Sequence, residues 1–77
     1  MTTRNDIRAM RAQAALQSYV EAKGEVFANS SDEIADLMAD LLHLTVRIDQ
    51  GDHPETTLRL AQMHFTAEHN NPEKDAE

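Results

Sequence analysis

Residues 31–50 most strongly constrain what this chain can fold into, because the helix that they predict is apolar around most of its circumference. At about 100° per residue, the apolar side chains sweep roughly two-thirds of the helical circle. A surface helix needs an apolar stripe only a little wider than ~100°. The apolar arc consists of Ile34, Leu37, Met38, Leu41, Leu42, Leu44, Thr45, Val46 and Ile48, and the polar stripe consists of Asp32, Asp36, Asp40, His43 and Arg47.

A chain of 77 residues offers few other elements with which to cover such an arc. A domain of this size gains little stability from its own core unless disulfides, a metal or a second subunit add to it. The sequence contains no cysteine, which excludes disulfides and thiolate metal sites. We therefore expect a homodimer or a higher oligomer. The predicted self-association residues are Leu37, Met38, Leu41, Leu42 and Val46.

Start and stop signals divide the chain into three helices, and no segment has the alternating apolar pattern of a strand. The first helix is expected to begin at Thr3, where Thr3 and Asp6 fit a capping box. It should end near Lys23, before Gly24 in the left-handed closing position. One apolar face of this helix is formed by Ala9, Ala12, Leu16, Tyr19 and Val20.

The second helix is expected to start after a capping box formed by Ser30 and Glu33 and to run to about residue 50, where Gly51 stops it. In the connector before it, Val26 and Phe27 are expected to cover the end of the helical bundle. The sequence thus predicts an all-α fold.

The third helix is predicted to start at Asp52, with Pro54 in its first turn and Glu55 at the position that a capping box requires. It should extend to about His69. Because a tight turn joins them, the second and third helices are expected to form an antiparallel hairpin. The first helix should pack across this hairpin or across a neighbouring subunit.

The organisation predicted from these signals is one helical domain over residues 1–71 and a disordered acidic tail over residues 72–77. Charged residues interrupt every apolar run near the start of the chain, and no segment approaches ~18 consecutive apolar residues. We therefore expect a cytoplasmic protein without a membrane segment.

The formal charge of −7 is unevenly distributed. Residues 1–23 contain four basic and two acidic residues, whereas residues 24–77 contain three basic and twelve acidic residues. The single basic cluster, formed by Arg4, Arg8 and Arg11, is too small to favour direct nucleic-acid binding. The acidic remainder favours a basic protein partner. The candidate partner-binding face consists of Asp32, Asp36, Asp40 and His43.

Carboxylate and imidazole side chains on the second and third helices are the only candidates for metal chemistry. His64 and Glu68 are four residues apart on one helix face, and antiparallel packing would bring them towards the polar stripe. In the alternative interpretation the stripe is solvated, and His64 pairs with Glu68 or with a partner chain. No glycine-rich elbow or phosphate loop is present, so we expect neither an enzyme nor a cofactor. The weak metal candidates are Asp36, Asp40, His43, His64 and Glu68.

Residues 36–43 (DLMADLLH) and 61–68 (AQMHFTAE) resemble small uncharacterised all-α proteins encoded by phages and other mobile elements. The resemblance covers roughly residues 31–69 and brings no established activity. It implies a bacterial or phage setting, in which short acidic proteins block or adapt a host machine. The expected function is therefore a non-enzymatic interaction protein, for example an inhibitor of the anti-CRISPR kind or an adaptor of a DNA-binding regulator.

A fainter similarity is to the MazG-like all-α nucleotide pyrophosphohydrolases, in which acidic motifs on adjacent helices hold magnesium near a nucleoside triphosphate. Glu33 and Asp36 correspond to half of the first motif, with Asp40 one turn further on. The third helix lacks the second acidic pair, because Glu55 and Glu68 are thirteen residues apart. This similarity implies metal-dependent nucleotide chemistry as an alternative function. A purely structural, self-assembling helical protein is a further alternative.

Overall fold

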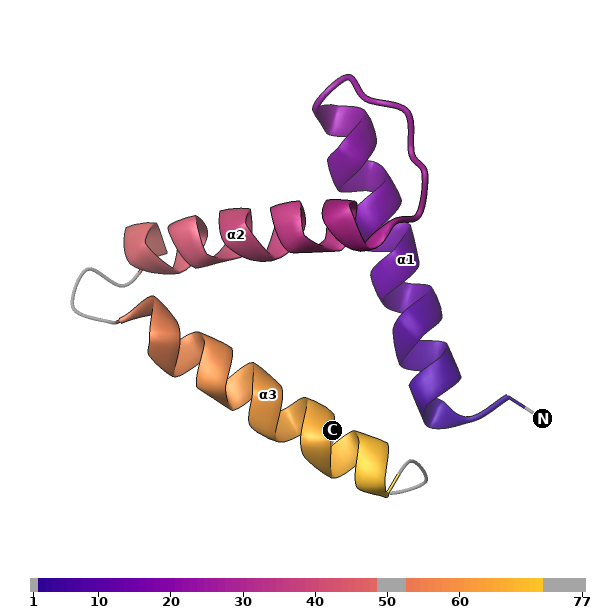
Figure 1. Cartoon of the computed structure of the whole chain (residues 1–77), viewed down its shortest axis with the longest axis vertical. Coiled ribbons are helices and arrows are strands. Elements are labelled where there is room, and N and C mark those ends of the chain that lie inside the picture. Colours follow the sequence, from indigo (N-terminus) through magenta and orange to yellow (C-terminus); the bar gives the residue numbers. More distant parts are fainter. Residues whose placement is uncertain (1, 49–52, 72–77) are drawn as a thin grey trace.

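Three helices form the sides of an open triangle (Figure 1). The computed structural model describes residues 2–48 and 53–71. Helix α1 spans Arg4–Ala22, α2 spans Ser31–Ile48 and α3 spans Pro54–Asn70. The described residues contain no strand, so the all-α prediction is confirmed.

The first helix has the ends that the sequence predicts. The Thr3 hydroxyl accepts a hydrogen bond of 3.1 Å from the Asp6 amide, and the Asp6 carboxylate accepts one of 3.0 Å from the Thr3 amide. Both bonds satisfy amide donors that have no partner inside the helix. Beyond α1, Gly24 has a φ of 77°, the left-handed conformation that glycine adopts without steric cost.

The capping box at the start of α2 is also confirmed. The Glu33 carboxylate accepts a hydrogen bond of 2.8 Å from the Ser30 amide, and the Ser30 hydroxyl accepts one of 3.3 Å from the Glu33 amide. The second Glu33 oxygen accepts a further bond of 2.8 Å from the Ala28 amide. The predicted end of this helix at residues 50 and 51 lies outside the described residues.

The start of α3 differs from the prediction. His53, and not Asp52, is the N-cap residue, and its side chain makes no capping hydrogen bond. The physical reason is Pro54, which has no amide hydrogen, suits the first helical position and forces the residue before it into an extended conformation. Asp52, the other member of the predicted capping box with Glu55, lies outside the described residues. At the other end, the Asn71 amide donates to the Ala67 carbonyl at 3.1 Å.

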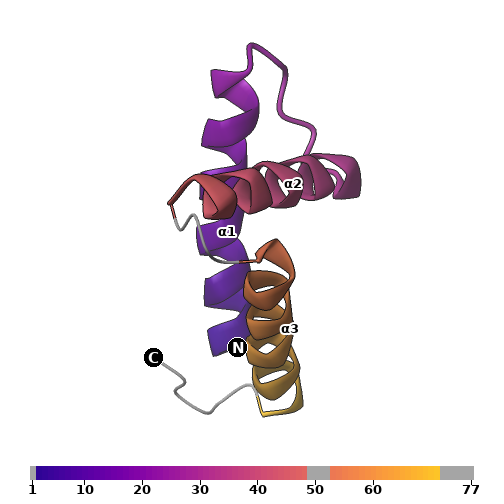
Figure 2. The same cartoon turned by 90° about the vertical axis from the view of Figure 1, so that its left-hand side faces the viewer.

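The helices α2 and α3 run in opposite directions and contact each other, which confirms the expected antiparallel pair. They lie closest where the chain turns and then diverge, while α1 crosses the beginning of α2 (Figures 1 and 2). Polar contacts close the third corner of the triangle. There, the Asn5 side-chain amide donates a hydrogen bond of 2.9 Å to the backbone carbonyl of Glu68, and Arg8 Nε lies 3.4 Å from Glu68 Oε2.

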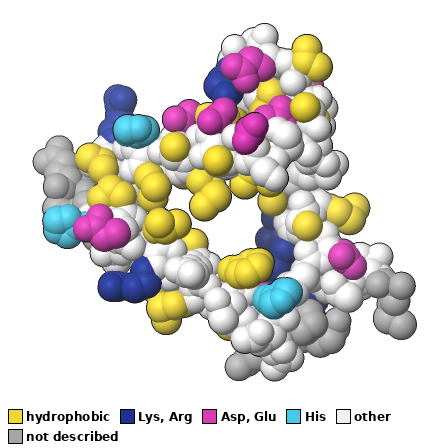
Figure 3. Space-filling view, viewed as in Figure 1, with side chains coloured by type: hydrophobic (Ala, Val, Ile, Leu, Met, Phe, Trp, Pro, Cys, Tyr) yellow, Lys and Arg dark blue, Asp and Glu magenta, His cyan; other side chains and the backbone are white. Residues whose placement is uncertain are grey.

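Very little of this arrangement is buried. Within the described part of the chain only Leu16 and Val20 are buried, with exposed fractions of 3% and 0%. Both belong to the predicted apolar face of α1. The molecule is a thin plate of 35 × 35 × 18 Å, and apolar side chains surround an opening at its centre (Figure 3).

The connector between α1 and α2 corrects one expectation. Val26 is 91% exposed, so it does not cover the end of a bundle, and Phe27 is only half-buried. The reason is the open arrangement, because α3 lies far from this connector and no closed bundle end forms beside it (Figure 1).

Candidate interaction surface

Half of the predicted acidic face lies against α1. The Tyr19 hydroxyl donates a hydrogen bond of 2.5 Å to Asp40, and Lys23 Nζ lies 3.6 Å from Asp36 Oδ2. Lys23 also pairs with Glu25 at 3.3 Å and lies 4.7 Å from the centre of the Tyr19 ring. These contacts hold the end of α1 against the outer edge of α2.

The same contacts shift two pKa values. The hydrogen bond to Asp40, followed by partial desolvation, raises the pKa of Tyr19 above its ordinary value. Desolvation lowers the pKa of Lys23, but the hydrogen bond and charge of Glu25, together with Tyr19 and Asp36, outweigh it and raise this pKa. Both pKa shifts arise because the end of α1 lies close to the carboxylates of Glu25, Asp36 and Asp40.

The rest of the acidic face points to solvent. Asp32 and His43 are exposed, as is Arg47 further along the polar stripe. Acidic side chains follow the outer edge of α2, and apolar side chains follow the edge that faces the opening (Figure 3). The second helix thus separates its two kinds of side chain onto opposite edges.

The apolar face of α2 is not covered by the rest of the chain. No residue of this helix is buried. Of the predicted self-association residues, Leu37 and Leu42 are half-buried, and the others are 47–50% exposed: Met38, Leu41 and Val46. The prediction omitted Ile34, Leu44 and Ile48, which are similarly or more exposed. The helical periodicity that defined the apolar arc already contained them.

An apolar groove lies between α1 and α2 and has a volume of about 430 Å³. Small alanine side chains on α1 face larger aliphatic side chains on α2, and no ionisable side chain lines the groove. At its polar rim the Asn29 side chain donates to the Gln13 side chain at 3.3 Å. The groove therefore suits an apolar side chain. The lining residues are Ala9, Ala12, Gln13, Leu16, Asn29, Ile34, Leu37, Met38 and Leu41.

The candidate metal ligands do not converge. Over residues 2–48 and 53–71, no three His, Asp or Glu side chains are grouped so that they could hold a metal ion. Asp40 is bonded to Tyr19, and Glu68 is paired with Arg8 across the α1–α3 corner. Glu68 therefore bonds to α1 in place of the His64 side chain that the sequence suggested.

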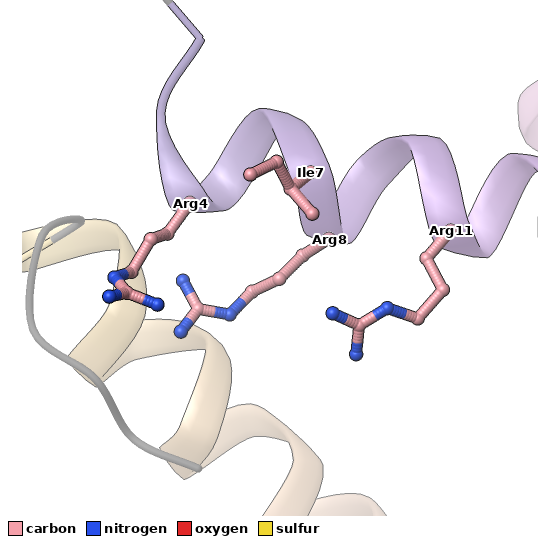
Figure 4. A pocket seen from close by; sticks show the side chains of 4 residues that line it. All are labelled: Arg4, Ile7, Arg8 and Arg11. Atoms are coloured by element: carbon pink, nitrogen blue, oxygen red, sulfur yellow. The ribbon is translucent and has the colours of Figure 1, made fainter.

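One arginine of the α1 cluster, Arg8, takes part in the contact with α3. Arg4, Arg8 and Arg11 extend from one side of α1, and the first two reach towards α3 (Figure 4). Arg8 donates to the Asn5 side chain at 2.9 Å and pairs with Glu68. Arg8 therefore helps to close the triangle.

Comparison of this chain with protein-family models, curated proteins and solved structures gives no match. The helices of the described residues are also too short or too polar to cross a membrane. Function is therefore inferred from the residues and surfaces of this chain itself.

Proposed function

We propose that this chain is a small non-enzymatic interaction protein. The observation that carries this proposal is the uncovered apolar opening, since Leu16 and Val20 are the only buried side chains among the described residues. Large contiguous apolar surfaces on small proteins mark contacts with other protein chains. Such an opening is costly for a protein that acts alone and useful for one that acts by binding.

The chemistry of the partner follows from the outer edge of α2. We define this acidic edge as Asp32, Asp36, Asp40 and His43. The contacts of Tyr19 with Asp40 and of Lys23 with Asp36 reduce the freedom of two carboxylates before any partner binds, which lowers the ordering cost of association. A basic protein surface, such as that of a host complex that binds nucleic acid, complements this edge.

Charge reversal on the acidic edge tests the proposal. Asp32 is the best position because it is exposed, whereas reversal of Asp36 or Asp40 would also disturb α1. Partners captured from native host cells should bind Asp32→Lys about fivefold more weakly than the unchanged protein, which corresponds to about 1 kcal/mol. The difference should shrink as salt increases.

The matched control is Glu55→Lys, which makes the same charge change on an exposed residue of α3. This control should bind captured partners as the unchanged protein does. Equal weakening by both variants would indicate an effect of net charge alone and would contradict a specific acidic edge. Unchanged binding of Asp32→Lys would contradict it as well.

A further inference from the structure

The corner between α1 and α3 contains a pocket of about 290 Å³ with an aromatic wall. Phe65 and His69 lie one turn apart on α3, and their rings stack with 5.5 Å between centroids and 15° between planes. Phe65 is nevertheless 64% exposed, so most of its ring surface is available to a ligand. The wall therefore offers an oriented ring to a second ring. The lining residues are Asn5, Arg8, Ala9, Phe65, Glu68 and His69.

The opposite wall of this pocket is polar and is held in place by its own contacts. Arg8 Nη1 donates to the Asn5 side-chain oxygen at 2.9 Å, and Arg8 Nε lies 3.4 Å from Glu68 Oε2. The side chains of Arg8 and Glu68 are only 18% and 22% exposed. Because these contacts already fix the guanidinium group, a ligand that binds beside it incurs a small ordering cost.

A second, smaller pocket of about 40 Å³ adjoins the first, because Arg8 lines both of them. Its other lining residues are Arg4, Ile7 and Arg11, and the three guanidinium groups extend from one side of α1 (Figure 4). Arg4 is exposed, and the ion pairs among residues 2–48 and 53–71 do not include it. Its planar fork of N–H donors matches the two oxygens of a carboxylate.

We propose that the two pockets together bind a small aromatic carboxylate, whose ring stacks on Phe65 and whose carboxylate pairs with Arg4 and Arg8. The pocket of about 290 Å³ has room for one or two fused rings, and the pocket of about 40 Å³ has room for a group of carboxylate size. An uncharged ring or an aliphatic acid would use only one of the two walls. This site is separate from the acidic edge, because α1 and α3 form it.

The charges at this corner favour an anion. Arg4 and Arg8 are positive, and Glu68 is the only acidic residue that lines either pocket. Glu68 directs one carboxylate oxygen to Arg8, which reduces the repulsion that it exerts on a bound carboxylate. His69 is the other titratable group of the aromatic wall, and it adds positive charge when it is protonated. A carboxylate therefore meets a locally positive surface on a chain whose formal charge is −7.

The first experiment compares two probes by calorimetry with the full chain. 2-Naphthoate has a carboxylate on two fused aromatic rings, and 2-naphthalenemethanol has the same rings with an uncharged group. The naphthoate should bind about tenfold more tightly, because it alone forms charge-assisted hydrogen bonds with the arginines. Absence of naphthoate binding at about 1 mM would overturn the proposal. Equal affinities for the two probes would also overturn it.

Arg4→Gln tests the carboxylate end of the site. Because Arg4 is exposed and outside the ion pairs of the described residues, this variant should keep its helicity by circular dichroism. It should bind 2-naphthoate about tenfold more weakly and 2-naphthalenemethanol with unchanged affinity. The matched control is Arg59→Gln, which removes the same charge from an exposed residue of α3 that lines neither pocket. Equal weakening by both variants would indicate an effect of net charge and overturn the proposal.

Phe65→Leu tests the aromatic end, because it keeps an apolar side chain and removes the ring. It should weaken the binding of both probes about threefold through the loss of stacking. Met63→Leu, a change at an exposed apolar residue of α3 that lines neither pocket, should leave both affinities unchanged. Unchanged binding by Phe65→Leu would place the probes elsewhere, as in the groove between α1 and α2, and overturn the proposal. Asp32→Lys should bind 2-naphthoate normally, so failure of the basic-partner proposal would be recognised separately.

Discussion

Tyr19 on α1 and Asp40 on α2 are joined by a hydrogen bond of 2.5 Å between the phenolic hydroxyl and a carboxylate oxygen, across 21 positions of sequence. This bond, together with the pairing of Lys23 and Asp36, fixes where α1 crosses α2. The acidic edge of α2 is therefore held partly by the chain itself, because α1 contacts two of its carboxylates.

The titration of Tyr19 should report this contact. It is the only tyrosine, so tyrosinate absorbance follows one group. In the folded protein its pKa is raised, chiefly by the hydrogen bond to Asp40, and in Asp40→Ala it should fall towards the ordinary value of 10.0. Because the folded pKa is the higher one, the contact stabilises the fold below about pH 10, and this is lost as pH rises through the folded pKa. Identical titration curves for the two proteins would contradict the contact.

The capping carboxylate of Glu33 should make α2 sensitive to acid. Backbone hydrogen bonds, first from Ala28 and then from Ser30, lower the pKa of Glu33 below 4.5. A lowered folded pKa means that the stabilisation is complete above the ordinary value and is lost as pH falls through the folded pKa. Glu33→Gln should therefore be less stable at neutral pH and lose less helicity by circular dichroism on acidification. Glu55→Gln, outside the capping box, is the control and should behave as the unchanged protein. An unaltered acid profile in Glu33→Gln would argue against the capping role.

Substitution of Gly24 should lower the free energy of unfolding only through the strain of its left-handed backbone conformation. Its φ is 77°, and a Cβ built there meets no atom within 4 Å. Gly24→Ala should therefore lower the free energy of unfolding by about 1 kcal/mol, the cost of a left-handed conformation for a residue with a side chain. Gly24→Asn should cost less, because asparagine tolerates this conformation better. Chemical denaturation measures both, and a neutral Gly24→Ala would show that this turn can take another conformation.

The stability contributed by the contact between α1 and α3 should depend weakly on salt concentration. Arg8 and Glu68 form an ion pair at 3.4 Å, with both side chains about four-fifths covered. Glu68→Gln should lower the free energy of unfolding by up to about 1 kcal/mol, as partly exposed ion pairs do. The cost should decrease at high salt. The double variant Arg8→Glu with Glu68→Arg should recover part of it, and a double variant no better than the sum of the single ones would show that the charges do not interact.

The sequence by itself determined the helix starts that depend on neighbouring residues. The Thr3–Asp6 and Ser30–Glu33 boxes and the left-handed Gly24 could be predicted, because each involves hydrogen bonds or dihedral angles within a few residues. The same locality explains the error at α3, where Pro54 sets the helix start one residue later than the pattern of Asp52 suggested. Periodicity likewise defined the two edges of α2.

Only the tertiary structure decided how the helices meet. The sequence does not reveal that Tyr19 bonds to Asp40, or that Glu68 bonds to Arg8 in preference to His64, because these pairs depend on the crossing of helices distant in sequence. The spacing of apolar residues predicts which face of a helix is apolar, but it does not predict which segment packs against that face. The open triangle, with Leu16 and Val20 as the only buried side chains of the described ranges, follows from those crossings, because three short helices arranged as the sides of a triangle cannot enclose the broad apolar arc of α2.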